Sequence, residues 1–264
     1  MEKKKIELYS KSDQLVNAAV DKIVVDLFNK KGNCVGGQAI VMTGCSPISG
    51  VTSTSIALGI AMAASKRKTL IIDCDVRKSI KYKKLNDATS VGLANYLVQD
   101  NDDGSLNIDD IIYSTNINNL SYIPCGNCNE SSTRILCSTR MEKLLEAVKG
   151  KFDYVIFDFP SLAVVPDAQI LFNEADGIIL LAALGETRKK QIKDAKRKVA
   201  PYIDKYYGMI INKVRMDVYK KNVRDYNYYF VDKAGEQKFK GNAAYKKYKK
   251  NAEQQGGVQT NEEK

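Results

Sequence analysis

The apolar positions of this 264-residue chain form short continuous runs that alternate with segments of helical periodicity. Short apolar runs bounded by polar residues are typical of strands that are buried on both faces, and the longer patterns between them are typical of helices. The predicted strands are Ala39–Thr43, Thr69–Asp73, Leu120–Pro124, Tyr154–Asp158, Gly177–Leu184 and Gly208–Asn212. The predicted helices are Thr52–Ser65, Arg134–Val148, Pro166–Glu174 and Arg188–Ile203. This alternation indicates an α/β fold in which a parallel sheet carries helices on both faces.

The length of the chain predicts one complete α/β domain. We place this domain at residues 36–232, after a helical extension at 1–35 and before a basic, disordered tail at 233–264. The longest uncharged apolar stretches, Ile56–Ala64 and Gly177–Leu184, are shorter than the roughly 18 residues that cross a bilayer. The N-terminal stretch is charged and has no apolar region after it, so we expect no secretory signal and predict a cytoplasmic protein.

Basic residues gather in the last part of the chain, and histidine is absent. Residues 1–187 carry 20 Lys and Arg against 22 Asp and Glu, whereas residues 188–264 carry 21 against 9. This basic end is expected either to be attracted to an anionic membrane or polyphosphate surface or to form a solvated helix with a disordered tail; we expect no nucleic-acid partner. Without histidine, Ser-His and Cys-His nucleophile pairs are excluded, so carboxylates or a metal must do any proton and charge work.

The stretch CSPISGVTST, residues 45–54, has the form of a phosphate-binding loop that lacks its lysine. It lies between an apolar run and a helical run, which is the strand, loop and helix order of such loops. The usual pattern ends in Gly-Lys-[Ser/Thr], and this chain has Gly50, Val51 and Thr52 there. Loop amides and the helix dipole still favour a phosphate, but the loss of one preorganised donor costs about 10² to 10³ in transfer rate. We therefore predict weak nucleotide binding and slower transfer.

Acidic residues stand at the ends of two further predicted strands. Asp73 and Asp75 lie two apart in LIIDCDVRK, so an extended backbone places both carboxylates on one face. Asp158 closes the apolar run of DYVIFDFPS, as the acid of a Walker B strand does. Any one of these acids could instead cap a helix. Because the carboxyl ends of parallel strands meet at one edge, the set predicts a Mg²⁺ and polyphosphate site.

Five motifs together resemble the bacterial tyrosine kinases of capsular and extracellular polysaccharide synthesis, which belong to the P-loop NTPases along with the septum-positioning and partition ATPases. They are GCSPISGVTST, LIIDCDVRK, FDYVIFDFPS, DAQILFNEADGIILLAALGETRK and GMIINKV. The resemblance covers about residues 36–230, and several motifs in order are more specific than one. The tyrosines at the end are similar to the cluster that such kinases phosphorylate on each other, although they could also be incidental: Tyr226, Tyr228, Tyr229, Tyr245 and Tyr248.

The resemblance implies ATP and Mg²⁺ as cofactors. The implied nucleotide-binding residues are Cys45, Ser49, Gly50, Val51, Thr52, Ser53, Arg77 and Asn212, of which Asn212 contacts adenine. The implied catalytic acids are Asp73, Asp75 and Asp158, and the implied Mg²⁺ ligands are Thr52, Asp73 and Asp158. Asp73 either takes the tyrosine proton or coordinates Mg²⁺. The family also implies a homo-oligomer and a membrane-embedded chain-length or activator protein, which would hold the chain at the inner face of the cell membrane.

Departures from the family pattern leave three functions open. Val51 replaces the loop lysine, Ile48 replaces a glycine, and Ser49 replaces a common acid. The N-terminal helix lacks the Glu-x-x-Arg-x-x-Arg motif that drives ring assembly, and Arg134 stands where the family has a glutamate. The chain is accordingly expected to be a slow or partner-dependent tyrosine kinase, a nucleotide-sensing pseudokinase of the export machinery, or a partition-type ATPase that works on a surface.

Overall fold

The computed structural model describes residues 5–10, 14–31, 36–77, 91–99, 106–127 and 130–215. The chain separates into two units, residues 1–214 and 215–264, and the helices and strands of the described residues belong to the first. The tail and its five candidate tyrosines lie outside the described residues. The domain boundaries at residues 35 and 232 therefore stay predictions.

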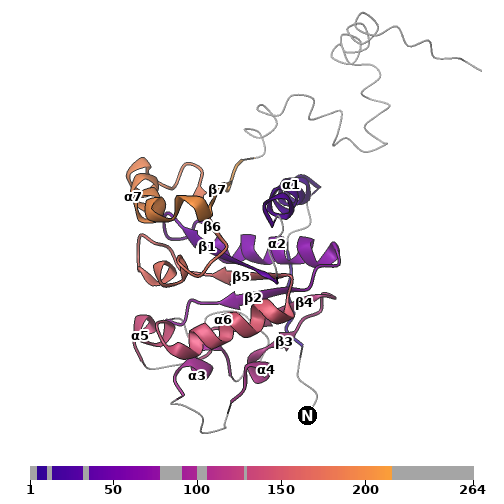
Figure 1. Cartoon of the computed structure of the whole chain (residues 1–264). Coiled ribbons are helices and arrows are strands. Elements are labelled where there is room, and N and C mark those ends of the chain that lie inside the picture. The colour runs from indigo at the N-terminus through magenta and orange to yellow at the C-terminus, as the bar shows by residue number, and fades with distance from the viewer. Residues whose placement is uncertain are drawn as a thin grey trace, which may run out of the picture. The chain divides into compact units, whose positions relative to one another are not determined.

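Seven strands of the described residues form one sheet in the order β3-β4-β2-β5-β1-β6-β7 (Figure 1). Their bounds are β1 Gln38–Gly44, β2 Thr69–Asp73, β3 Tyr113–Ser114, β4 Leu120–Ile123, β5 Tyr154–Asp158, β6 Gly177–Ala183 and β7 Tyr206–Asn212. Every neighbouring pair is parallel except β3 and β4. The predicted parallel α/β sheet is confirmed, and each predicted strand is present. The short antiparallel β3 was not predicted.

The helices depart more from the sequence pattern than the strands do. They are α1 Gln14–Lys31, α2 Val51–Ala64, α3 Leu93–Leu97, α4 Ile108–Ile111, α5 Ser132–Leu136, α6 Thr139–Lys151 and α7 Lys189–Val199, with the 3₁₀ helices η2 Asp167–Leu171 and η3 Ala200–Lys205. The helix predicted over 134–148 is divided, because Ser138 adopts an extended backbone before α6. The helix predicted over 188–203 ends early, since Pro201 has no N–H to continue it.

Side chains of the central strands alternate between two apolar clusters, one on each face of the sheet. On β5, Val155 and Phe157 join one cluster, and Tyr154 and Ile156 join the other. The first cluster is covered by α3, α5, α6 and α7, and the second by α1 and α2, which pack against each other (Figure 1). This burial on both faces explains why the strands read as continuous apolar runs. No helix among the described residues is both long enough and apolar enough to cross a membrane.

Candidate functional site

The loop between β1 and α2 turns sharply and is tied to β7. Gly50 has a φ of 88°, in the left-handed region that glycine adopts without strain. A Cβ at this position would lie 2.2 Å from Asn212 Nδ2. Asn212 Nδ2 donates a hydrogen bond of 3.0 Å to the carbonyl of Ser49. The predicted adenine contact Asn212 therefore supports the loop from the end of β7.

The first turn of α2 offers hydrogen-bond donors. The backbone N–H of Thr54 donates to the carbonyl of Gly50 at 3.0 Å, and no side chain in the described part of the chain caps the helix. The N–H groups of Val51, Thr52 and Ser53 have no protein acceptor among the described residues. Such amides and the helix dipole together form an anion site.

A cavity of about 400 Å³ opens in front of this turn. The predicted site residues that line it are Ser49, Gly50, Val51, Thr52, Ser53, Asp75, Arg77 and Asp158. The exposed side chains of Ile48 and Val164 line it too. Cys45 lines a different cavity, and Asp73 and Asn212 are absent from the described lining. The structure thus brings the loop together with two of the three predicted acids.

The third acid, Asp73, lies behind the cavity wall. Asp73 and Asp158 are register partners on β2 and β5, and Asp73 is fully buried. Asp73 accepts hydrogen bonds from the backbone N–H of Asp75 at 3.1 Å and from the hydroxyl of Tyr122 at 3.4 Å. Burial, and then the charges of Asp73 and Asp158, hold the pKa of Tyr122 well above its usual value, so Tyr122 remains a donor. This arrangement fixes Asp73 in place and orients Asp75.

Arg77 is held by Asp167, an acid that was not among the predicted site residues. Its guanidinium donates to both carboxylate oxygens of Asp167, at 3.2 and 3.1 Å. The hydroxyls of Ser132 and Thr133 donate to the same carboxylate, each at 3.1 Å. Asp167 is 1% exposed, so these four bonds satisfy a buried charge. Asp167 is the first residue of the apolar run DAQIL, and in the sequence an acid at this position suggests a helix cap. Only the fold shows that it faces Arg77.

The side chain of Val51, which stands where the family loop has a lysine, makes an apolar contact instead of binding phosphate. Val51 is half-buried and packs against the apolar cluster on the α2 face of the sheet. Among the described residues that line the cavity, Arg77 is the one cation, beside the carboxylates of Asp75 and Asp158. A bare polyphosphate would meet more negative than positive side-chain charge here, and a bound metal ion would offset this excess.

The donor set fits a phosphate with a divalent cation. The unengaged amides of α2 point to an anion, and the buried hydroxyl of Ser49 has no hydrogen-bond partner among the described residues. Within the described part of the chain, no three acidic or cysteine side chains form a metal cluster. One or two carboxylates beside a phosphate are what Mg²⁺ uses in such sites. Thr52, Asp75 and Asp158 are the lining residues that could supply its oxygen ligands.

Comparison with known proteins supports the motif resemblance. The family model described as AAA domain matches residues 40–187. Tyrosine-protein kinase CpsD of Streptococcus agalactiae serotype III is 36% identical over 168 residues, which are 63% of this chain and 69% of that protein. The chain belongs to the bacterial tyrosine kinase family. The resemblance predicted from the motifs is confirmed.

Solved structures share the fold of this kinase family member. The chimerical protein CapA2B2 has a TM-score of 0.68 at 22% identity, covering 79% of this chain and 93% of that one. A cobyrinic acid a,c-diamide synthase from Mycobacterium smegmatis has a TM-score of 0.51 at 15% identity, covering 66% and 72%. That synthase was solved with an ATP analogue and magnesium bound.

In this family member, Ile48 has a positive φ, a backbone conformation that glycine adopts more readily than isoleucine. Its φ is 60°, which is strained for a β-branched side chain, and the side chain is 81% exposed. Burial therefore does little to offset the strain.

Proposed function

We propose that this chain is an ATP- and Mg²⁺-binding tyrosine kinase of capsular or extracellular polysaccharide synthesis, which slowly phosphorylates tyrosines of its own C-terminal segment. The supporting observation is the 400 Å³ cavity in which the free amides of α2 face Asp75 and Asp158. The family membership gives this cavity its reaction, the transfer of a phosphoryl group to a tyrosine.

Several of the lining residues then have tasks in phosphoryl transfer. The amides of Val51, Thr52 and Ser53 bind phosphate oxygens, and Arg77 contributes positive charge. The Thr52 hydroxyl and the Asp158 carboxylate would hold Mg²⁺, which would supply positive charge beside the phosphates. Asp75, which lines the cavity, is our candidate to accept the tyrosine proton, and buried Asp73 would position Asp75 through the hydrogen bond from the Asp75 N–H.

A second function is favoured by the packing of Val51. Without the loop lysine, transfer loses one preorganised positive donor, a loss of about 10² to 10³ in rate. Arg77 cannot freely replace it, because its guanidinium is hydrogen-bonded to both carboxylate oxygens of Asp167. The alternative is a pseudokinase that binds Mg·ATP and signals its presence to the polysaccharide export machinery.

The partner in either case is a membrane-embedded chain-length or activator protein. Family membership supports this partner and a homo-oligomer. Such a partner would hold the chain at the inner face of the cell membrane.

Incubation with γ-labelled ATP and Mg²⁺, with and without the activator, tests the proposal. We expect slow label incorporation into tyrosine that increases with the activator and is lost in Asp158→Asn. Calorimetry with Mg·ADP separates the two functions. Binding without incorporation under all conditions would leave the pseudokinase, and the absence of binding would reject both.

A further inference from the structure

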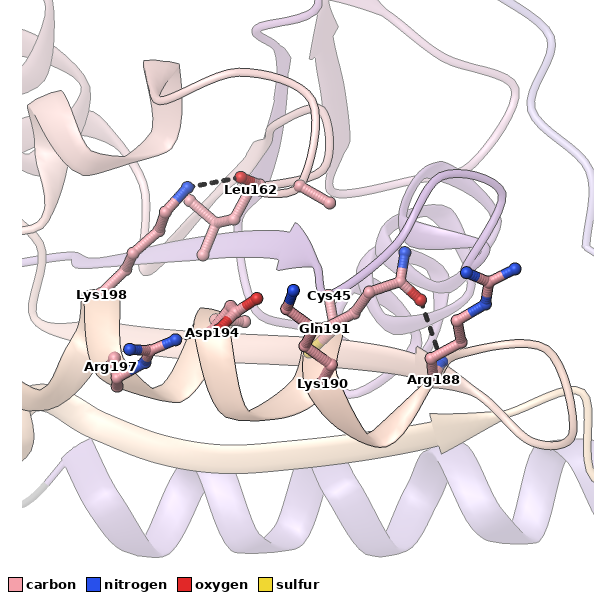
Figure 2. A pocket seen from close by; sticks show the side chains of 10 residues that line it. Cys45, Leu162, Arg188, Lys190, Gln191, Asp194, Arg197 and Lys198 are labelled. Carbon is pink, nitrogen blue, oxygen red and sulfur yellow. Dashed lines mark hydrogen bonds and ion pairs between the residues drawn. The ribbon is translucent and has the colours of Figure 1, made fainter.

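A second cavity, of about 710 Å³, lies between α7 and the segment after β5 (Figure 2). We call it the α7 cavity. Its wall carries the basic side chains of Arg188, Lys190, Arg197 and Lys198, and its floor includes Cys45 and Leu162. Figure 2 shows Lys198 reaching from α7 to the carbonyl of Leu162. The cavity has the size of sites that take ligands as large as a nucleotide.

The charge of this wall is not balanced by the protein. Asp194 is the one carboxylate among the described residues that line the cavity, and it pairs with Arg197. Lys198 donates to a neutral carbonyl at 2.6 Å. Arg188 and Lys190 have no acidic partner among the described residues. The lining of the α7 cavity therefore holds four basic side chains and one carboxylate.

The floor of the cavity is uncharged. Burial raises the pKa of the Cys45 thiol to about 11, and Lys196 lowers it by less. The thiol is therefore protonated at neutral pH. Leu162 and Ala163 complete an apolar surface opposite the basic wall. A hollow with cations on one side and apolar groups on the other suits a ligand that joins a phosphate to an uncharged body.

We propose that the α7 cavity is a second anion site of this protein, which binds a phosphate-bearing small molecule without a metal ion. The contrast with the nucleotide cavity supports this assignment. There, two carboxylates accompany one arginine, so a phosphate needs Mg²⁺; here, the excess of positive charge suffices. The proposal does not depend on kinase activity.

The α7 cavity is linked to the nucleotide loop through a short chain of hydrogen bonds. Lys198 holds the carbonyl of Leu162, and the N–H of Leu162 donates to the carbonyl of Gly44 at 3.0 Å. The hydroxyl of Ser161 donates to the same carbonyl at 3.0 Å, and Ser161 lines the nucleotide cavity. An anion that attracts the Lys198 ammonium would weaken its bond to Leu162. Occupancy of the α7 cavity is therefore expected to change the affinity for Mg·ADP.

Calorimetry with inorganic pyrophosphate in EDTA tests the site on the full chain. We expect binding that weakens with salt and falls about tenfold in Arg188→Gln/Lys190→Gln, where two cations are lost. The matched control is Lys189→Gln/Lys193→Gln, which removes the same charge from α7 outside the cavity lining and should bind like the parent. No binding in EDTA, or equal weakening in both variants, would overturn the proposal.

Two further measurements test the source of the phosphate group and the coupling between the two cavities. Vesicles of phosphatidylglycerol and phosphatidylcholine that displace pyrophosphate from the parent protein would support a lipid headgroup as the source of phosphate. Failure to displace it would support a soluble phosphate compound. Pyrophosphate should also change the Mg·ADP affinity of the parent protein and of the control Lys189→Gln/Lys193→Gln. It should not change the Mg·ADP affinity of Arg188→Gln/Lys190→Gln. An equal change in all three proteins would refute the coupling between the cavities.

Discussion

The ion pair between Arg77 and Asp167 should stabilise the fold far more than surface pairs of similar length. Asp167 is 1% exposed and accepts four hydrogen bonds, whereas the Arg77 side chain is 46% exposed. Removing one partner of a fully buried pair costs about 3 to 5 kcal/mol. Water reaches half of Arg77 and lowers this cost, so we expect Arg77→Ala to lose about 2 to 3 kcal/mol of unfolding free energy. Asp167→Ala should lose a similar amount.

Urea denaturation of the two single variants and the double variant gives the coupling energy, which we expect to be about 2 kcal/mol. The matched control is the pair of Lys151 and Asp109, whose atoms are 2.6 Å apart but whose side chains are 48% and 73% exposed. Its coupling should stay below about 0.5 kcal/mol. Equal coupling energies in the two cycles would refute the argument that burial of Asp167, and not the distance between charges, sets the energy.

Three further substitutions or probes test the loop. Val51→Lys should raise ATP turnover or tyrosine labelling by up to about 10², and Asp158→Ala should abolish the gain; an unchanged rate in a folded protein would assign the defect elsewhere. Ile48→Gly should add about 0.5 to 1 kcal/mol of unfolding free energy by relieving the positive φ, and a lower urea midpoint would contradict this. With a pKa of about 11, Cys45 has only about one thiol in a thousand ionised at pH 8, so peptide mapping after alkylation should find exposed Cys137 modified well before it; equal labelling would disprove the burial of Cys45.

The sequence by itself determined the sheet and the position of the loop between β1 and α2. Strands buried on both faces must be apolar at every position, so their runs are visible without any knowledge of contacts. The strand, loop and helix order from Ala39 to Ser65 then fixes where a phosphate can bind, because the amides of a helix start need no particular side chain. Asp75 and Asp158 followed from the rule that parallel strands end at one edge.

Only the tertiary structure decided which side chains meet across long separations in the chain. Arg77 and Asp167 are 90 residues apart, and nothing local to either one distinguishes their bond from a helix cap or a surface charge. Asp73 and Asp75 look equivalent in the sequence, but Asp73 is buried by the packing around β2 and bonded to the hydroxyl of Tyr122. In the sequence, the basic residues of α7 look like a solvated helix face. It becomes the wall of a cavity because Leu162, on the segment after β5, closes over it, and such closure depends on packing between elements that no local pattern encodes.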